Sequence, residues 1–107
     1  MRIEILYFSG CPNHQPAVNR VRAVLAREGE FADLTEVEVP NPAAAQRLRF
    51  LGSPTIRING LDIEKSARRS QFIGWSCRTY NHQGQQLGLP PEEWIQAAIH
   101  EAKRQVP

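Results

Sequence analysis

The chain contains 107 residues, a length that suits one domain with one modest hydrophobic core. Apolar residues make up 41% and charged residues 22%, which indicates a folded globular protein and excludes a disordered one. The net charge of +2 is too small to predict binding to nucleic acid. The chain has no apolar run of roughly 18 residues, no signal-peptide pattern, and too few cysteines for a disulfide-rich secreted domain. We therefore expect a single domain over residues 1–107, in the cytoplasm, with neither a nucleic-acid nor a membrane partner.

Three elements are predicted in the first 40 residues. Residues 3–8 form a nearly continuous apolar run, which is typical of a strand covered on both faces. From Ala17 the apolar residues recur at helical spacing, and Gly29 ends this pattern. Because Pro16 cannot donate a backbone hydrogen bond, we expect the regular helix to start late or to kink there. Residues 34–39 alternate between polar and apolar side chains and predict a half-exposed strand near a sheet edge.

The next part of the chain predicts a short helix and a third strand. Asn41 has the character of a helix N-cap, and the helix it begins runs over residues 43–51 and ends at Gly52. Residues 54–59 predict a strand with alternating isoleucines on one face. The pair Asn59-Gly60 is a turn signal.

The last part of the chain is less regular until its final helix. We interpret residues 61–75 as an ordered excursion that carries apolar and basic side chains. Residues 76–80 predict a brief fourth strand, and the glycines within 81–89 predict a turn region. A final helix opens at Pro90-Pro91 with acidic residues in its first turn, where the helix dipole favours them. Its expected buried face consists of Trp94, Ile95, Ala98, Ile99 and Ala102.

In this order the elements read β-α-β-α-β-β-α. A right-handed crossover makes the first two strands parallel, and the third strand is expected to pair antiparallel with the fourth. The predicted fold class is therefore α/β, with a three-layer α/β/α sandwich around a four-stranded mixed sheet.

Cys11 is the residue whose position most clearly suggests chemistry. It follows the first strand and stands at the start of the first helix, next to Pro12. The free N–H groups and the dipole of a helix N-terminus stabilise an anion, so a thiol at such a position favours the thiolate. The thiolate is the form that attacks disulfides and binds soft metals. The alternative is a buried cysteine that happens to precede a helix.

Two segments and the order of elements resemble the thioredoxin superfamily in its compact glutaredoxin-like form. The segments are residues 6–14 (Leu-Tyr-Phe-Ser-Gly-Cys-Pro-Asn-His) and 52–56 (Gly-Ser-Pro-Thr-Ile), and the resemblance covers nearly the whole chain. It implies a thioredoxin-like fold in which Cys11 is the attacking thiolate. It further implies a cis peptide bond before Pro54 and a substrate groove shaped by Pro12, Ser53, Pro54 and Thr55. The implied partners are disulfide-bearing proteins or small thiols.

A second likeness concerns residues 77–80, Cys-Arg-Thr-Tyr. The chain is similar to small thioredoxin-like proteins that combine a Gly-Cys-Pro-Asn motif with a later Cys-Arg-x-Tyr, and some of these are named for their similarity to organomercurial lyases. This likeness directs attention to Cys77 as a second thiol.

The chain also departs from the family pattern, because His14 stands where the dithiol motif has its second cysteine. A dithiol cycle within the motif is therefore excluded. Cys11 would have to act with an external thiol such as glutathione, or with Cys77, since a mixed disulfide needs a second thiol to resolve it. Apart from such a thiol, we expect no cofactor.

His14 and Cys77 each have an open interpretation. His14 lies three residues after Cys11 and would either stabilise the thiolate or relay its proton, unless it is simply an exposed residue of the first helical turn. Cys77 would resolve a mixed disulfide, join Cys11 as a soft-metal ligand, or act as a small buried apolar residue. If Cys77 lies in the fourth strand, it is roughly 9–10 Å from the first strand, further than the Cα separation of about 7 Å that a disulfide allows.

Two further patterns concern possible metal ligands and a group of arginines. No closed metal site is expected, because Cys11 and His14 have ligand-like spacing but no second close pair of ligands follows. Arg57, Arg68, Arg69 and Arg78 would form either a basic rim that favours anionic thiols or an ordinary solvated surface.

The sequence thus predicts a thiol–disulfide oxidoreductase-like protein with one motif cysteine, with Cys11, His14 and Cys77 as the candidate catalytic residues. The alternative is a non-catalytic thiol module that binds a soft metal, an organomercurial or a protein partner.

Overall fold

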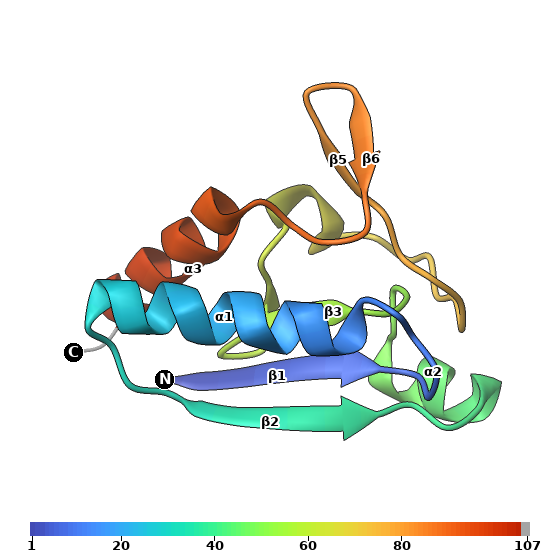
Figure 1. The fold of residues 1–107 in the computed structure, drawn as a ribbon. Helices are drawn as coiled ribbons and strands as arrows, with labels where there is room; N and C mark the ends of the chain where they lie inside the picture. Colours follow the sequence, from blue (N-terminus) through green and yellow to red (C-terminus); the bar gives the residue numbers. More distant parts are fainter. Residues whose placement is uncertain (106–107) are drawn as a thin grey trace.

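The computed structural model describes residues 1–105, which form a mixed α/β fold with three α-helices and a four-stranded mixed sheet (Figure 1). The α/β class and the four-stranded mixed sheet are thereby confirmed. The elements in chain order are β1 (Arg2–Tyr7), α1 (His14–Glu28), β2 (Asp33–Glu38), α2 (Pro42–Leu48), β3 (Thr55–Ile58), β4 (Leu61–Asp62), a 3-10 turn η1 (Lys65–Ala67), β5 (Tyr80–His82), β6 (Gln85–Leu87) and α3 (Glu92–Arg104).

The sheet has the strand order β2-β1-β3-β4. β1 is parallel to the edge strand β2, as expected, and antiparallel to β3. Leu6, near the end of β1, lies opposite Thr55, the first residue of β3. The loop after β1 and the loop before β3 therefore lie at the same end of the sheet, opposite the end where both termini lie (Figure 1).

The two faces of the sheet carry different helices. Ile3 and Ile5 of β1 pack with the isoleucines of β3 against α1 and α3, and these side chains form the larger hydrophobic core. Leu6 points to the other face, because successive side chains alternate across a strand. There it packs with Phe50 and with the alanines of α2 in a smaller core. The sheet is thus covered on both faces, as its nearly continuous apolar central strand predicted.

The helix ends follow the local sequence with two differences. Asn41 caps α2 as predicted, its Oδ1 accepting a hydrogen bond of 2.8 Å from the amide of Ala44. α2 ends at Leu48 rather than at residue 51, because Arg49 adopts a left-handed conformation with φ of 54°. α1 begins before Pro16 rather than after it, since a proline in the first turn gives up only an amide that the helix does not use.

The predicted fourth strand over residues 76–80 is wrong. The fourth strand is β4, which follows β3 directly through the turn at Asn59 and Gly60. Both turn residues have positive φ, 52° and 83°, as the tight hairpin turns that match strand twist require. The predicted turn at Asn59-Gly60 is thus confirmed. The strand after it was missed because it is two residues long and contains the buried charge of Asp62.

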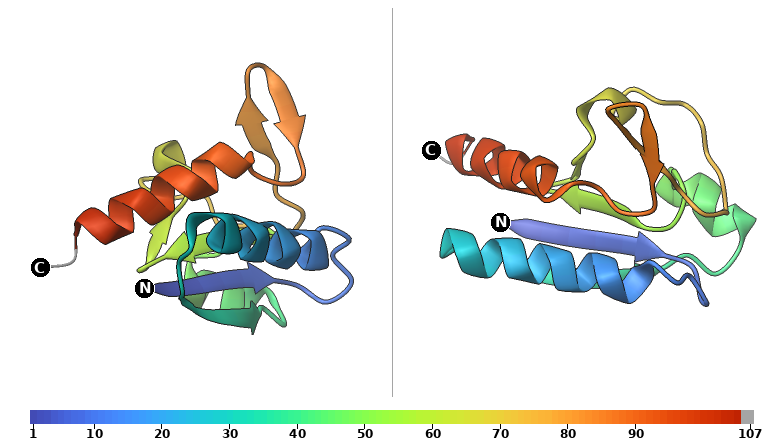
Figure 2. Two further views of the ribbon diagram at one scale, coloured as in Figure 1. Left: turned by 60° about the vertical axis from the view of Figure 1, so that its left-hand side comes forward. Right: turned by 45° about the horizontal axis from the view of Figure 1, so that its top comes forward.

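Residues 80–87 form a hairpin rather than the predicted turn region. β5 and β6 pair antiparallel in a separate two-stranded sheet. Figures 1 and 2 show this hairpin standing away from the main sheet, beyond the N-terminal end of α3. Its strands were missed because each is three residues long and, apart from Tyr80 and Leu87, consists of polar residues, so neither shows the apolar alternation of a half-buried strand.

No helix among residues 1–105 is both long enough and apolar enough to span a bilayer.

Candidate functional site

Cys11 lies in the turn between β1 and α1, two residues before the helix N-cap Asn13. Its amide donates to the carbonyl of Phe8 at 3.2 Å, and its carbonyl accepts from the amide of His14 at 3.3 Å. Within residues 1–105 the amides of Asn13 and Gln15 have no hydrogen-bond acceptor. Cys11 is 9% exposed but belongs to neither hydrophobic core. The cysteine is therefore held in the turn before the helix, where it is buried without belonging to either packed cluster.

His14 is the first residue of α1 and faces β1 and β2. Its ring stacks on the ring of Tyr7, with centroids 3.6 Å apart and an interplanar angle of 6°. Its Nε2 lies 2.6 Å from Oε1 of Glu36 on β2. In the described part of the chain, the His14 ring forms no hydrogen bond with the Cys11 thiol, and the two residues are joined only through their backbones. The pair His14–Glu36 thus ties the first turn of α1 to the sheet edge, on the Cys11 side of the molecule.

The loop before β3 approaches the Cys11 turn. The Ser53–Pro54 peptide bond is cis, the geometry that the resemblance implied. Ser53 Oγ accepts a hydrogen bond of 3.3 Å from the amide of Phe8, the same residue whose carbonyl holds the amide of Cys11. Ser53 therefore connects the cis-proline loop to the turn that carries Cys11.

The other side of Ser53 is already occupied by the chain itself. The Ser53 amide donates to the carbonyl of Ser76 at 2.8 Å, and its carbonyl accepts from the amide of Arg78 at 2.9 Å. These bonds make a short parallel bridge in which Cys77 lies opposite Ser53. A cis-proline loop in the resembling family is expected to leave these groups free for a substrate. Here Ser53 and Thr55 are fully buried, so residues 76–78 take the place next to Ser53.

Cys77 is exposed at this bridge, in contrast to Cys11. The prediction that Cys77 belongs to the fourth strand of the sheet is wrong. Cys77 lies instead beside Ser53, the residue that precedes the cis-proline. Trp75 holds the preceding residues in place: its Nε1 donates to the carbonyl of Val39 at 2.8 Å, and its ring meets the ring of Phe8 edge-on at 6.0 Å. Cys11 is therefore linked to Ser53 through Phe8, and Cys77 is held opposite Ser53 by the bonds of its two neighbours, Ser76 and Arg78.

Arg78, next to Cys77, is buried rather than part of a basic rim. Its guanidinium donates to both carboxylate oxygens of Asp62 at 2.8 and 2.9 Å, and to Glu64 at 3.0 Å. It also donates to Oγ1 of Thr55 at 3.2 Å and lies 4.2 Å from the ring centroid of Tyr80. Burial by itself lowers the pKa of Arg78, but the hydrogen bonds to Asp62 and the other nearby negative groups outweigh it and raise the pKa.

Tyr80 completes this buried polar cluster. Its hydroxyl donates to the carbonyl of Pro54 at 2.5 Å, and burial raises the pKa of the phenol. Gly52 allows the close approach of this segment, since a Cβ at residue 52 would lie 2.8 Å from Cβ of Arg78. The Cys-Arg-x-Tyr motif and the Gly-Ser-Pro-Thr motif, 25 positions apart in the sequence, are thus two sides of one contact.

The sequence identified some members of this site and missed others. Cys77 lies beside Ser53, which precedes Pro54 and Thr55, and Cys11 is linked to Ser53 through Phe8, whereas Pro12 is exposed on the Cys11 turn. Asp62 and Glu64 were missed because nothing local distinguishes them from surface carboxylates. The burial of Asp62 cannot be predicted unless its partner Arg78 is known, because a buried carboxylate needs a paired positive charge.

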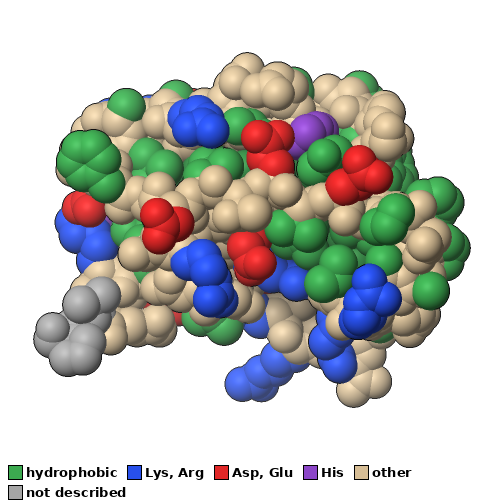
Figure 3. Space-filling model, turned by 90° about the horizontal axis from the view of Figure 1, so that it is seen from below, with side chains coloured by type: hydrophobic (Ala, Val, Ile, Leu, Met, Phe, Trp, Pro, Cys, Tyr) green, Lys and Arg blue, Asp and Glu red, His purple; other side chains and the backbone are tan. Residues whose placement is uncertain are grey.

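The described part of the chain contains no cluster of three or more His, Cys, Asp or Glu side chains that could hold a metal ion. On the face seen in Figure 3, both acidic and basic side chains lie among apolar ones.

A family model described as "Domain of unknown function (DUF2703)" matches residues 13–99. The match begins two residues after Cys11 and includes Ser53, Pro54 and Cys77. A search of curated proteins and a search of solved structures give no match to the chain.

Proposed function

We propose that this chain, which belongs to the DUF2703 family, is a thioredoxin-like thiol–disulfide oxidoreductase that uses Cys11 as its nucleophile and Cys77 as its resolving thiol. The single observation that carries the proposal is the position of both cysteines around Ser53. Cys11 is attached to it through Phe8, and Cys77 pairs directly opposite it.

The arrangement of the helices supports a thioredoxin-like fold. α1 and α3 pack on the face of the sheet that carries Ile5, and α2 packs on the face that carries Leu6. We interpret this as the three-layer α/β/α sandwich of a thioredoxin-like domain, in which the cis-proline loop lies beside the Cys11 turn. β4 takes the place of the fourth strand in that plan, and the hairpin β5–β6 is an addition to it.

The proposed reaction has two exchanges. The thiolate of Cys11 attacks one sulfur of a substrate disulfide, forming a mixed disulfide and releasing the other half as a thiolate. The thiolate of Cys77 then attacks the sulfur of Cys11, which releases the second half of the substrate and leaves a Cys11–Cys77 disulfide. The substrate has gained two electrons from the protein. Two molecules of an external thiol such as glutathione then reduce the Cys11–Cys77 disulfide and leave as their own disulfide.

The surroundings of Cys11 support the first exchange. The unbonded amides of Asn13 and Gln15 lie at the start of α1, where a negative charge is stabilised. His14 is held by Tyr7 and Glu36 on the adjacent sheet edge, so its role is to fix the first turn and, in protonated form, to add positive charge there. The low exposure of Cys11 restricts attack to a sulfur that fits into the turn.

The test is the pH dependence of alkylation at each cysteine, measured by mass spectrometry of the two cysteine peptides after iodoacetamide treatment. Because Cys77 is exposed, it is a reference thiol within the same molecule. An ordinary thiol becomes about twentyfold more reactive between pH 7 and pH 9, whereas a stabilised thiolate changes less than about threefold. We expect the flat profile at Cys11, and a rise of about twentyfold at Cys11 would disprove its activation.

The second exchange is tested by trapping. Treated with a substrate disulfide, wild-type protein should yield the internal disulfide, and Cys77→Ser should stop at the mixed disulfide on Cys11. Ser76→Ala is the matched control, since it changes the neighbouring side chain while the backbone bonds to Ser53 remain. A mixed disulfide that persists equally in wild type would remove Cys77 from the mechanism.

A non-catalytic thiol module is the second candidate, favoured by His14 in place of a second motif cysteine. In that case Cys11 and Cys77 would together bind a soft metal ion or an organomercurial. Titration with Hg²⁺ would then give one tight site that is lost in both Cys11→Ser and Cys77→Ser, in a protein that exchanges no disulfide.

A further inference from the structure

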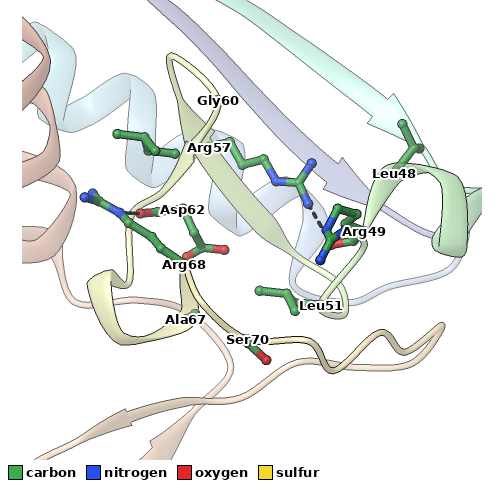
Figure 4. A pocket seen from close by; sticks show the side chains of 10 residues that line it. Leu48, Arg49, Leu51, Arg57, Gly60, Asp62, Ala67, Arg68 and Ser70 are labelled. Atoms are coloured by element: carbon green, nitrogen blue, oxygen red, sulfur yellow. Dashed lines mark hydrogen bonds between the residues drawn. The ribbon is translucent and has the colours of Figure 1, made fainter.

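A cavity of about 200 Å³ lies between the C-terminal end of α2 and the strands β3 and β4 (Figure 4). Three arginines line it: Arg49, Arg57 and Arg68. Arg57 Nη2 donates to the carbonyl of Arg49 at 2.8 Å, and Arg68 Nε donates to the carbonyl of Asp62 at 2.7 Å. Figure 4 shows these side chains reaching the cavity from different elements, which gives it a positively charged wall.

Two of these arginines have no ion-pair partner. Arg68 binds Glu101 through two hydrogen bonds of 2.9 and 2.7 Å, and Asp62 is paired with Arg78. Arg49 and Arg57, by contrast, form no ion pair within residues 1–105, although Glu4 lies opposite Arg57 in the strand register. Burial lowers the pKa of Arg57 while Asp62 and Glu4 act to raise it. A bound anion would stabilise its charge further.

A second cavity, of about 280 Å³, adjoins the first and contains Cys77. The two cavities share Leu51, Ala67 and Ser70 in their linings. The second cavity adds one arginine and one carboxylate, which are already bonded to each other. Together the cavities are lined by four arginines against two carboxylates, and the unpaired positive charges are those of Arg49 and Arg57.

We propose that the two adjoining cavities form an anion-selective groove that directs small carboxylate-bearing disulfides to Cys77. The groove rests on the proposed function, because it assigns a class of small disulfide to Cys77, the resolving thiol of that reaction. The carboxylate is attracted to the planar guanidinium groups of Arg49 and Arg57, which bind carboxylates well. The Cys77 thiolate attacks one sulfur of the bound disulfide, forming a mixed disulfide and releasing the other half as a thiolate.

The experiment uses Cys11→Ser, in which Cys77 is the single remaining thiol of the chain. Its rate of reaction is measured with 5,5′-dithiobis(2-nitrobenzoate), which carries two carboxylates, and with 4,4′-dithiodipyridine, which is neutral. Adding Arg49→Gln, Arg57→Gln or both should slow the anionic reagent about threefold to tenfold and the neutral reagent less than about twofold. Half-molar KCl should reduce this difference. Arg69→Gln is the matched control, because Arg69 is exposed and lines neither cavity.

Equal effects on both reagents, or no effect on the anionic one, would overturn the groove. Arg49→Gln tests the groove without changing a buried side chain, since Arg49 is exposed. Arg57 bonds to the backbone carbonyl of residue 49, so this bond does not depend on the Arg49 side chain. Because Cys11 is absent throughout, the result is independent of whether Cys11 is an activated nucleophile. A charge-selective Cys77 beside an unreactive Cys11 would refute the proposed function and keep the groove.

Discussion

Two regions of this molecule are held together in different ways. In the larger core, β1 and β3 meet α1 and α3 through aliphatic side chains such as Ile5, Ile56 and Ile99, all of them fully buried. The segment from β4 to β5 contributes Ile63 to that core, but it is also attached through a buried polar cluster. In this cluster Arg78 bonds to Asp62 and lies over the ring of Tyr80, whose hydroxyl donates to the carbonyl of Pro54 in the cis-proline loop.

The difference matters for function, because the second region carries Cys77. Aliphatic packing is non-directional and tolerates modest changes of shape, whereas a buried ion pair fails when one partner is removed. Both regions should therefore contribute to global stability, but only the polar cluster should determine whether Cys77 stays beside Ser53. Four measurements test this division.

The largest effect is expected for Arg78→Met. It leaves Asp62 buried without its partner, which should lower the free energy of unfolding by about 3–5 kcal/mol. Chemical denaturation measures the loss, and hydrogen exchange at the amides of Ser53 and residue 78 reports release of the bridge. The double variant Arg78→Met/Asp62→Leu removes both charges and should recover most of the stability. A single variant as stable as wild type would show that the pair anchors nothing.

Tyr80→Phe should produce a smaller loss in the same region. It removes the hydroxyl that bonds to the carbonyl of Pro54 and leaves that buried carbonyl unpaired, at a loss of about 1–3 kcal/mol. Thermal unfolding measures the change. The reaction rate of Cys77 with a neutral disulfide should rise at the same time, since its segment is held less firmly. A stability loss without any change at Cys77 would separate Tyr80 from the site.

Ile5→Val is the counterpart in the aliphatic core. Removing one buried methylene should lower the free energy of unfolding by about 0.5–1.5 kcal/mol. Because the core is shared by β1, β3 and two helices, amide exchange should accelerate throughout the sheet, with no preference for residues 76–78. Exchange confined to the Cys77 segment would contradict the division between the two regions.

The smallest effect is one of pH at Glu101, which joins α3 to Arg68 in the segment between β4 and β5. Its hydrogen bonds from Arg68 hold the pKa of the Glu101 carboxyl below its ordinary value of 4.5. Such a group adds stability above pH 4.5 that is lost as the pH falls through its folded-state pKa. Glu101→Gln should therefore make stability less dependent on pH in the acid range. Glu38→Gln, at an exposed position of β2, is the control and should leave the profile unchanged.

Local patterns were sufficient for much of the architecture. The apolar run of β1, the helical spacing in α1 and α3, the Asn41 cap and the turn Asn59-Gly60 all correspond to observed features. They are readable because periodicity and turn conformation depend on neighbours within a few residues. Polar strands are not: β4 and the hairpin β5–β6 have no apolar alternation, and they were missed for that reason.

The candidate site divides along the same line. That Cys11 precedes a helix, and that Pro54 begins a strand, follows from a few adjacent residues. That Cys77 lies opposite Ser53, that Arg78 is buried on Asp62, and that His14 binds Glu36 required the folded chain. These contacts join residues 16 to 24 positions apart, and they depend on charges and hydrogen bonds being matched at a distance. An isolated segment shows no sign of such a match, because each partner alone has the pattern of an ordinary surface residue.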